Sequence, residues 1–350
     1  MRFGVLAGER RAEVHTRPRF RVGPGQVLVR VGACNICTTD YQQWLGLRRH
    51  QLFPKAFGHE NAGVIEEAGE GVRSIGAGER VAVLSFGPCL ECRSCRRGLS
   101  SVFCPNALGI VNRDKKDDRG YYGFYGCGEY QVVSSRYVFR LSADLPFEHG
   151  GFVEPLATVI HGMRLLRIET GEKVLVLGAG TMGMLNAQAA RYYGGEVVLS
   201  EISEKKLAAA RGIGFQRCVN PKDPDFDERV RELTDGAGPD AVIVAVGVDD
   251  AYSQALRVAP LGCRFLLFAA GYPEPEWSLS PNAVHYRLWQ ILGTYGSSVA
   301  DWQEASDLLS RGAIDVEPLV EARYPLEEIQ SAFVKASEPG SYRVSVLLSQ

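Results

Sequence analysis

The sequence predicts an α/β protein with two domains, a β-rich domain followed by a doubly wound parallel sheet. Its length of 350 residues corresponds to about two domains of roughly 150 residues each. Before residue 150, short apolar stretches alternate with Gly, Pro and polar turns, which is typical of a β-rich sandwich or barrel-like domain. From about residue 170, continuous Val, Leu and Ile runs alternate with helical segments. This second pattern indicates a parallel sheet that helices cover on both faces.

Each part of the chain has its own expected elements. The apolar strands of the β-rich part are QVLVRVGAC (26–34), AGVIEEAG (62–69), ERVAVLSF (79–86) and EYQVVSSRYVFRL (129–141). The strands of the parallel sheet are KVLVL (173–177), EVVLS (196–200), AVIVAV (241–246) and RFLLFA (264–269), with helices at 181–193 and 203–211 between them. The tail contains two helices that end in Gly, at 302–312 and 325–340, and a strand at 342–348. A boundary rich in Gly, Pro and charge lies at 143–155.

Composition excludes several classes of protein. Lys and Arg number 39 and Asp and Glu 41, so the net charge of -2 argues against a protein that binds nucleic acid. No apolar run reaches the ~18 residues that cross a bilayer, and the first residues do not resemble a secretion signal. Nine cysteines, four of them between Cys89 and Cys104, indicate metal chemistry in a reducing compartment. We therefore expect a cytoplasmic protein with no membrane partner.

The segment GAGTMG, Gly178 to Gly183, has the form of a dinucleotide-binding turn. A buried strand precedes it and a helix follows it, which is the context that the motif requires. Gly178 permits the tight turn, Gly180 lets the backbone approach a pyrophosphate, and Gly183 lets the helix pack against the strand. The helix N-terminus then offers free N–H groups to the phosphates.

Glu201, eighteen residues beyond Gly183, is expected to bind the adenosine ribose. Its carboxylate can accept hydrogen bonds from both ribose hydroxyls and would repel a 2′-phosphate, so NAD is favoured over NADP. The pair Lys205 and Lys206 leaves NADP open as an alternative. The remaining residues that we assign to the cofactor site are Thr181, Met182, Val246 and Ala269.

Cys89, Cys92, Cys95 and Cys104 have the spacing C-x2-C-x2-C-x8-C. Two residues between cysteines let successive thiolates converge on one ion, and four thiolates complete a tetrahedral site with no open position. The spacing therefore predicts a structural zinc site in the lobe 89–104. An iron–sulfur cluster is the alternative, because Cys-x2-Cys runs also bind such clusters.

Three further segments contain metal-ligand residue types. They are CNICTTD (34–40), FGHENAG (57–63) and EPLATVIH (154–161). A single Cys or His is more often structural than a ligand, so each segment alone is a weak indication.

Taken in order along the chain, these motifs resemble the zinc-dependent medium-chain alcohol dehydrogenases nearly from end to end. The signature GHExxGxxxxxGxxV is present as GHENAGVIEEAGEGV, from Gly58 to Val72, followed by the cysteine lobe, the EPL segment and GAGTMG. The EPL form resembles the polyol and threonine dehydrogenase branch. The resemblance implies a GroES-like catalytic domain at 1–150, a Rossmann domain at 151–295, and a return to the catalytic domain at 296–350.

The resemblance also implies roles for individual residues. Cys37 and His59 would be ligands of a catalytic zinc, and Glu154 would be the third ligand, bound directly or through water. Glu60 would enter the coordination shell when water or substrate leaves, and Asp40 would orient His59. The further implied roles are proton acceptance by Thr39 and contact with the nicotinamide by Thr158.

The implied activity is hydride transfer between NAD and a secondary alcohol, with two zinc ions per chain. Zinc would activate the alcohol oxygen, and the substrate would be a polyol, a sugar-like compound, a cyclitol or an amino alcohol. The partner would be a small alcohol or ketone. The chain would form a homodimer or homotetramer, with 288–296 as a candidate edge strand. Two alternatives remain, a zinc-free NADPH-dependent double-bond reductase and a catalytically silent binding protein.

Two features depart from the family pattern. Gln42 occupies the position where relatives often have a proton-relay histidine, so the relay ends in solvent or uses another group such as His50. The segment 113–130 combines a charged run with five aromatics. Its tyrosines, Tyr121, Tyr122 and Tyr125, either line the substrate site or pin a surface loop.

Overall fold

The computed structural model describes residues 1–48, 50, 52–107, 115–271 and 273–348. It consists of two compact units, Met1–Ala157 with Gly296–Gln350, and Thr158–Tyr295. Residues 151–157, which the sequence analysis assigned to the Rossmann domain, are in the first unit. There, Gly151 packs so closely on β5 that a β-carbon would approach the Glu60 carbonyl oxygen to 2.8 Å.

The first unit contains two sheets. The seven-stranded sheet has the order β16-β17-β3-β5-β6-β9, with β8 also paired to β3. Its strands are β3 (Gln26–Ile36), β5 (Glu60–Ala68), β6 (Arg80–Val83), β8 (Tyr130–Ser134), β9 (Val138–Arg140), β16 (Val320–Pro325) and β17 (Arg343–Leu347). The four-stranded sheet has the order β2-β1-β4-β7 and consists of β1 (Arg2–Gly8), β2 (Arg11–Thr16), β4 (Lys55–Ala56) and β7 (Tyr122–Gly123).

Short helices connect and cover these strands. They are α1 (Thr38–Trp44), α2 (Arg93–Arg96), α4 (Phe147–Gly150), α11 (Val299–Ser310) and α12 (Ile329–Ala336), with 3-10 turns at Ser101–Phe103, Ser135–Tyr137, Glu317–Leu319 and Leu326–Glu328. Helix α12 carries a buried face onto the core, where Phe333 contacts the rings of Trp44 and Phe57. The β-rich part and the C-terminal tail therefore share one apolar core.

The register of the large sheet brings two distant segments to one end of β3. Strand β17 runs antiparallel to β3 with Val344 opposite Ile36, and β5 runs antiparallel to β3 with Glu60 opposite Asn35. The last residues of β3 therefore lie beside the first residues of both neighbours. Cys37, which follows β3 directly, is placed at this end.

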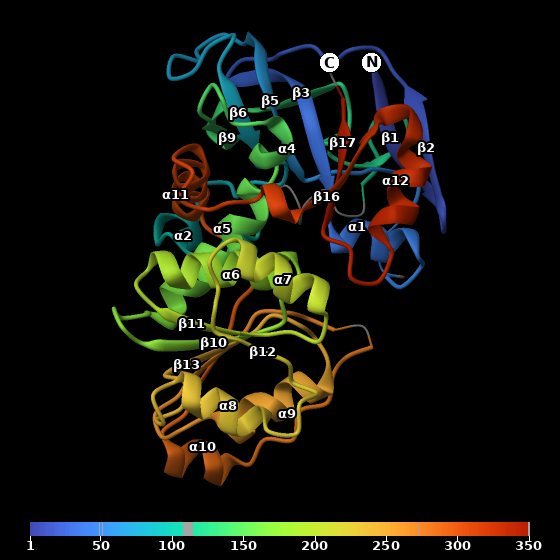
Figure 1. Ribbon diagram of the computed structural model, residues 1–350. Helices are drawn as coiled ribbons and strands as arrows, with labels where there is room; N and C mark the ends of the chain where they lie inside the picture. Colours follow the sequence, from blue (N-terminus) through green and yellow to red (C-terminus); the bar gives the residue numbers. More distant parts are fainter. Residues whose placement is uncertain (49, 51, 108–114, 272, 349–350) are drawn as a thin grey trace. The chain divides into compact units, whose positions relative to one another are not determined.

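The second unit is a six-stranded parallel sheet of order β12-β11-β10-β13-β14-β15. Its strands are β10 (Lys173–Leu177), β11 (Glu196–Ser200), β12 (Cys218–Val219), β13 (Ala241–Val244), β14 (Arg264–Leu267) and β15 (Gln290–Gly293), and its helices are α5 (Val153–Leu166, begun in the first unit), α6 (Thr181–Tyr192), α7 (Glu204–Gly212), α8 (Phe226–Leu233), α9 (Asp249–Val258) and α10 (Pro281–Arg287). Figure 1 shows α6 and α7 on one side of this sheet and α8 and α9 on the other. The strand order reverses between β10 and β13, the place where doubly wound sheets bind ligands.

The parallel sheet follows the expected pattern closely. KVLVL and EVVLS are β10 and β11 over their full lengths, whereas AVIVAV and RFLLFA end two residues earlier as strands than expected. The segment 288–296 contains β15, which is an edge strand. Within the described part of the chain, no helix has the length and apolar character needed to cross a membrane.

Candidate active site and metal centres

The end of β3 brings together Cys37, His59 and Glu60. One potential ligand atom from each lies within 4.8 Å of the other two. His59 precedes β5 directly and Cys37 is the N-cap of α1, so both side chains are held by regular structure. The separation suits a single ion, because zinc takes sulfur at ~2.3 Å and nitrogen at ~2.0 Å. Three protein donors, with Glu154 or Glu60 as the third beside Cys37 and His59, would leave one tetrahedral position open.

Asp40 connects the two ligand candidates. Its Oδ2 accepts a hydrogen bond from the Cys37 backbone N–H at 3.1 Å and lies 3.6 Å from His59 Nδ1. Asp40 is fully buried. Burial opposes protonation of His59, but the charges of Asp40 and Cys37 outweigh it and raise the pKa of His59 well above its ordinary value. A carboxylate at Nδ1 leaves Nε2 as the nitrogen for a metal.

Arg343 is the residue at this site that sequence reasoning missed. Its Nε and Nη2 donate to the two carboxylate oxygens of Glu60 at 2.8 and 2.7 Å, and Nη2 lies 3.8 Å from the Cys37 sulfur. Both partners of this ion pair are buried. The attraction of Glu60 outweighs burial and raises the pKa of Arg343. The available signal was an arginine at the start of a strand that carries no other charged residue.

Glu154 lies in the first turn of α5, outside the set of three ligand atoms that meet within 4.8 Å. Burial raises its pKa to about 7, while the charges of His59 and Arg343 act in the opposite direction. The carboxyl is therefore close enough to sense the site. Thr39 is partly buried on α1, two residues after Cys37.

The four cysteines of the lobe also converge. Their sulfur atoms all lie within 4.8 Å of one another, with Cys92 at 3.4 Å from Cys95 and 3.9 Å from Cys104. Four sulfurs around one zinc stand about 3.8 Å apart, so the lobe has the dimensions of a single-ion site. Backbone N–H groups of Glu91 and Cys92 lower the pKa of Cys89 to about 6, which favours the thiolate that a metal binds.

The three glycines of the turn after β10 differ in their surroundings. Gly178 has a φ of +97°, and a β-carbon on Gly183 would approach the Gly178 carbonyl oxygen to 1.8 Å. A β-carbon on Gly180, by contrast, would meet only Lys206 Nζ, at 3.9 Å. Turn formation and helix packing thus require two of the glycines, and the third leaves open space above the backbone. This is the arrangement that a bound pyrophosphate needs.

Glu201 lies at the end of β11 with its carboxylate fixed by three backbone donors. Oε2 accepts from Ala179 N at 2.8 Å, and Oε1 accepts from Ile202 N at 2.9 Å and Ser203 N at 3.0 Å. The other predicted cofactor residues lie on α5, on α6 and at the carboxyl ends of the sheet; they are Thr158, Thr181, Met182, Val246 and Ala269. The Ala269 carbonyl accepts a hydrogen bond from the Tyr252 hydroxyl.

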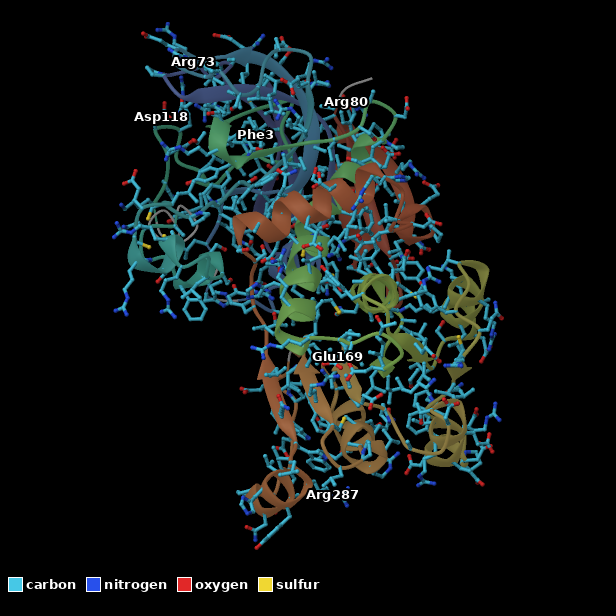
Figure 2. All side chains as sticks on the ribbon, turned by 90° about the vertical axis from the view of Figure 1, so that its left-hand side faces the viewer. Phe3, Arg73, Arg80, Asp118, Glu169 and Arg287 are labelled. Carbon is cyan, nitrogen blue, oxygen red and sulfur yellow. The ribbon has the colours of Figure 1, made fainter. Side chains whose placement is uncertain are left out.

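Two tyrosines of segment 113–130, Tyr121 and Tyr125, are bound by side-chain contacts within the β-rich unit. Tyr125 is buried against Phe3, and its hydroxyl donates to Asp117. The Tyr121 hydroxyl is hydrogen-bonded to a ring nitrogen of His15. Figure 2 shows the position of Phe3 within the β-rich unit. These contacts favour the loop-pinning interpretation for both tyrosines.

The remaining features singled out in the sequence are the charged run, Gln42 and His50. Residues 113 and 114 of the charged run lie outside the described residues. Gln42 accepts a hydrogen bond from Arg48 Nε at 3.0 Å, and His50 is exposed.

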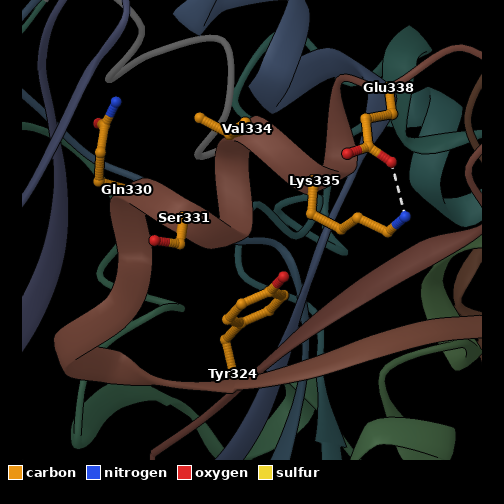
Figure 3. Close-up of a pocket in the computed structure, with 6 residues that line it drawn as sticks. All are labelled: Tyr324, Gln330, Ser331, Val334, Lys335 and Glu338. Atoms are coloured by element: carbon orange, nitrogen blue, oxygen red, sulfur yellow. Dashed lines mark hydrogen bonds and ion pairs between the residues drawn. The ribbon is translucent and has the colours of Figure 1, made fainter.

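A surface pocket of about 270 Å³ lies between α12 and β16 (Figure 3). Its lining residues are Tyr324, Gln330, Ser331, Val334, Lys335 and Glu338. None of them belongs to a candidate metal or dinucleotide site.

Comparison with known proteins gives a consistent result. Residues 23–143 match the alcohol dehydrogenase GroES-like domain, and residues 181–311 match the zinc-binding dehydrogenase family. The chain is 31% identical over 313 residues to 2-dehydro-3-deoxy-L-galactonate 5-dehydrogenase of Pseudoalteromonas atlantica, covering 88% of this chain and 87% of that one. It is 30% identical over 322 residues to L-threonine 3-dehydrogenase of Deinococcus deserti, covering 89% of each.

A solved structure extends this likeness to three dimensions. The protein, from Sinorhizobium meliloti, is described as a zinc-binding dehydrogenase and has NADP bound. It superposes with a TM-score of 0.86 at 28% identity, covering 99% of this chain and 98% of that one. With the β-rich unit and the parallel sheet described above, these matches confirm the predicted fold class, a GroES-like domain joined to a Rossmann-like domain.

Proposed function

Because the chain belongs to the zinc-dependent medium-chain alcohol dehydrogenases, we propose that it transfers hydride between NAD and a secondary alcohol. The observation that carries this proposal is the meeting of Cys37, His59 and Glu60 at the end of β3. A protein that had kept only the fold, or a zinc-free reductase, would not need this donor set. Zinc, when bound, supplies a Lewis acid that stabilises negative charge on the substrate oxygen.

Each residue around the proposed zinc has a separate role. Cys37 and His59 hold the metal, and Asp40 keeps the His59 ring in the tautomer that binds through Nε2. Glu154 completes the site directly or through water. Thr39 accepts the proton of the alcohol. Arg343 holds Glu60 by both oxygens, so Glu60 can approach the metal only by giving up part of that pair.

We propose NAD as the cofactor on the basis of Glu201. Its carboxylate is fixed by backbone donors at the end of β11, where the adenosine ribose would lie. A 2′-phosphate there would meet a negative charge. The Sinorhizobium meliloti structure has NADP bound, so NADP is the alternative cofactor that Glu201→Ala tests. We expect KM for NAD to rise at least about tenfold while KM for NADP falls.

The proposed substrate is a small polar molecule with a secondary hydroxyl, such as a polyol, a sugar-like acid, a cyclitol or an amino alcohol. The two curated relatives, which are named for a sugar acid and for threonine, support this class. The cysteine lobe would hold a second, structural zinc. Nine free cysteines support a reducing, cytoplasmic location.

We further propose that the chain forms a homodimer or homotetramer through β15. This strand ends the parallel sheet, and the large apolar side chains of Leu288 and Tyr295 beside it are exposed. An unpaired edge strand with exposed apolar side chains invites pairing with a second copy.

The test is NAD reduction against a panel of polyols, sugar acids, amino alcohols, cyclitols and simple aliphatic alcohols, at measured zinc content. The expected result is activity with polar secondary alcohols and two zinc ions per chain. One zinc or none, together with reduction of activated double bonds by NADPH, would support the zinc-free alternative. Binding without turnover of any substrate would support a silent protein.

A further inference from the structure

Lys55 is a half-buried lysine that the proposed function does not use. Lys55 begins β4, where strand pairing holds it opposite Leu6 of β1 and Tyr122 of β7. Its Nζ donates a hydrogen bond to Oε1 of Gln43 at 2.9 Å. The sheet thus fixes the backbone and Gln43 fixes the amine.

The hydrogen-bond partner of this amine, Gln43, lies on α1, the helix that also carries Asp40 of the candidate zinc site. Asp40 and Gln43 are three residues apart on α1, a spacing that places side chains on one helix face, and both are buried. Asp40 uses Oδ2 for the Cys37 backbone and for His59. Its Oδ1 is buried without a hydrogen-bond partner among the described residues. One carboxylate oxygen therefore contacts Cys37 and His59, while the other accepts no hydrogen bond from the described residues.

Keeping an ammonium group at this place has a cost. Burial lowers the pKa of Lys55, and Arg48 lowers it further, whereas the charges of Asp40 and Cys37 raise it. A partly buried cation is retained when a nearby anion compensates for its lost hydration. Of the two anions that act on Lys55, Asp40 has the larger effect.

We propose that Lys55 is a positioning residue that acts through Asp40 to weaken the hold of the catalytic site on zinc and so to strengthen zinc as a Lewis acid. The inference rests on the proposed function. A carboxylate partner makes a histidine a stronger ligand. A cation beside that carboxylate opposes this effect and also repels a second cation at short range. A metal with weaker donors keeps more positive charge for the substrate oxygen.

The test is the zinc affinity of Lys55→Met, measured by chelator competition, with the zinc of the cysteine lobe as an internal reference. We expect the catalytic zinc to be held at least about fivefold more tightly, because a repulsive charge has been removed, and kcat to fall. Lys55→Arg keeps the charge and should restore both values. A merely structural lysine would have the opposite effect, since a disturbed site holds zinc more weakly.

Arg48→Met is the matched control. This variant also removes one positive charge. Arg48, however, is hydrogen-bonded to Gln42. Gln42 is two residues from Asp40, so the two side chains lie on different faces of α1. We expect its zinc affinity to change less than about twofold. The increase in zinc affinity of Lys55→Met should persist at high salt, because salt screens exposed charges more strongly than buried ones.

Three results would overturn the inference. They are weaker or unchanged zinc binding in Lys55→Met, an equal effect in Arg48→Met, and no restoration in Lys55→Arg. If Lys55→Met misfolds, Lys55→Gln removes the charge while keeping a donor for Gln43, and the same tightening is expected. A chain that binds no zinc at Cys37 and His59 overturns the proposed function as well, whereas normal zinc binding with an unshifted Lys55→Met overturns this inference alone.

Discussion

The two candidate metal sites of this protein are assembled in opposite ways. The cysteine lobe takes its four sulfurs from Cys89–Cys104, a single short segment. The other site takes its donors from the end of β3 and the start of β5, and β17 adds Arg343 beside them. A local site needs only turns of the right length, whereas a site built from distant segments depends on the register of a whole sheet.

The sites also differ in what surrounds the ligands. Four thiolates leave no open position in the lobe. Around Cys37 the structure gathers the buried charged side chains of Asp40, Glu60 and Arg343, and Glu154 is close enough to sense their charges. Closed ligation stabilises the fold, while a charged and incompletely ligated site can act on a substrate.

The largest expected effect is on activity, in Cys37→Ala. Removing this donor should lower kcat/KM at least about a thousandfold, because Lewis-acid stabilisation is worth several kcal/mol and each ~1.4 kcal/mol is tenfold in rate. Zinc content should fall by about one ion per chain. The control is Cys34→Ala, which removes a buried thiol of β3 three residues earlier and should keep most activity. Equal losses in the two variants would contradict the assignment of Cys37.

Arg343→Met should cause the next largest effect, on stability. It leaves the fully buried carboxylate of Glu60 without its ion-pair partner, which costs about 3–5 kcal/mol in comparable cases. Urea unfolding of the zinc-loaded protein measures this loss. The double variant Glu60→Gln with Arg343→Met should recover part of it. If the double variant were no more stable than the single one, the unpaired charge would not be the cause.

Cys92→Ser should separate stability from chemistry. Loss of the lobe zinc removes folding free energy, and we expect Tm to fall by about 5–8 °C. Activity per folded molecule should stay within about threefold of the unaltered protein, since the lobe touches no reacting group. Cys218→Ser, outside both sites, serves as the control and should leave Tm nearly unchanged. Loss of activity at full zinc occupancy of the Cys37 site would break the proposed contrast.

The smallest effect concerns Glu154 in the zinc-free protein. Burial raises its pKa from the ordinary 4.5 to about 7. The folded state then binds this proton more tightly than the unfolded chain, so its contribution to stability is complete below pH ~4.5 and is lost as pH rises through ~7. Glu154→Gln lacks this loss. The Tm of the variant should therefore rise relative to the unaltered protein between pH ~4.5 and ~7 and then level off, and parallel profiles would contradict the burial of a titrating carboxyl.

Local patterns in the sequence predicted most of the fold. The strands β10 and β11 are the apolar runs KVLVL and EVVLS, because a strand buried on both faces must be continuously apolar. The glycine turn could also be predicted from the sequence. Gly178 has a positive φ, and Gly183 packs against the backbone of Gly178, which is close to it along the chain. The convergence of the four cysteines follows from their spacing for the same reason.

The interaction partners of individual side chains were harder to predict from the sequence. The sequence alone allowed two roles for the tyrosines of 113–130, substrate contact and loop packing. In the structure, Tyr125 is hydrogen-bonded to Asp117 and Tyr121 to His15. The bond from Lys55 to Gln43 had no sequence signal, because a lysine near the end of a loop is ordinarily solvated. These partners are separated along the chain and meet only when the sheets form.

The sequence by itself therefore determined the parallel sheet, the glycine turn and the cysteine spacing, because in each the interacting atoms are neighbours along the chain. Only the tertiary structure decided that Arg343 neutralises Glu60 and that Lys55 stands near Asp40. Lys55 is placed by the pairing of β4 with β1 and β7. For Arg343 the physical reason is the antiparallel register of β3 with β5 and β17, which brings residues from both ends of the chain to one buried point. Charges placed there are costly unless paired, and no local pattern specifies their partners.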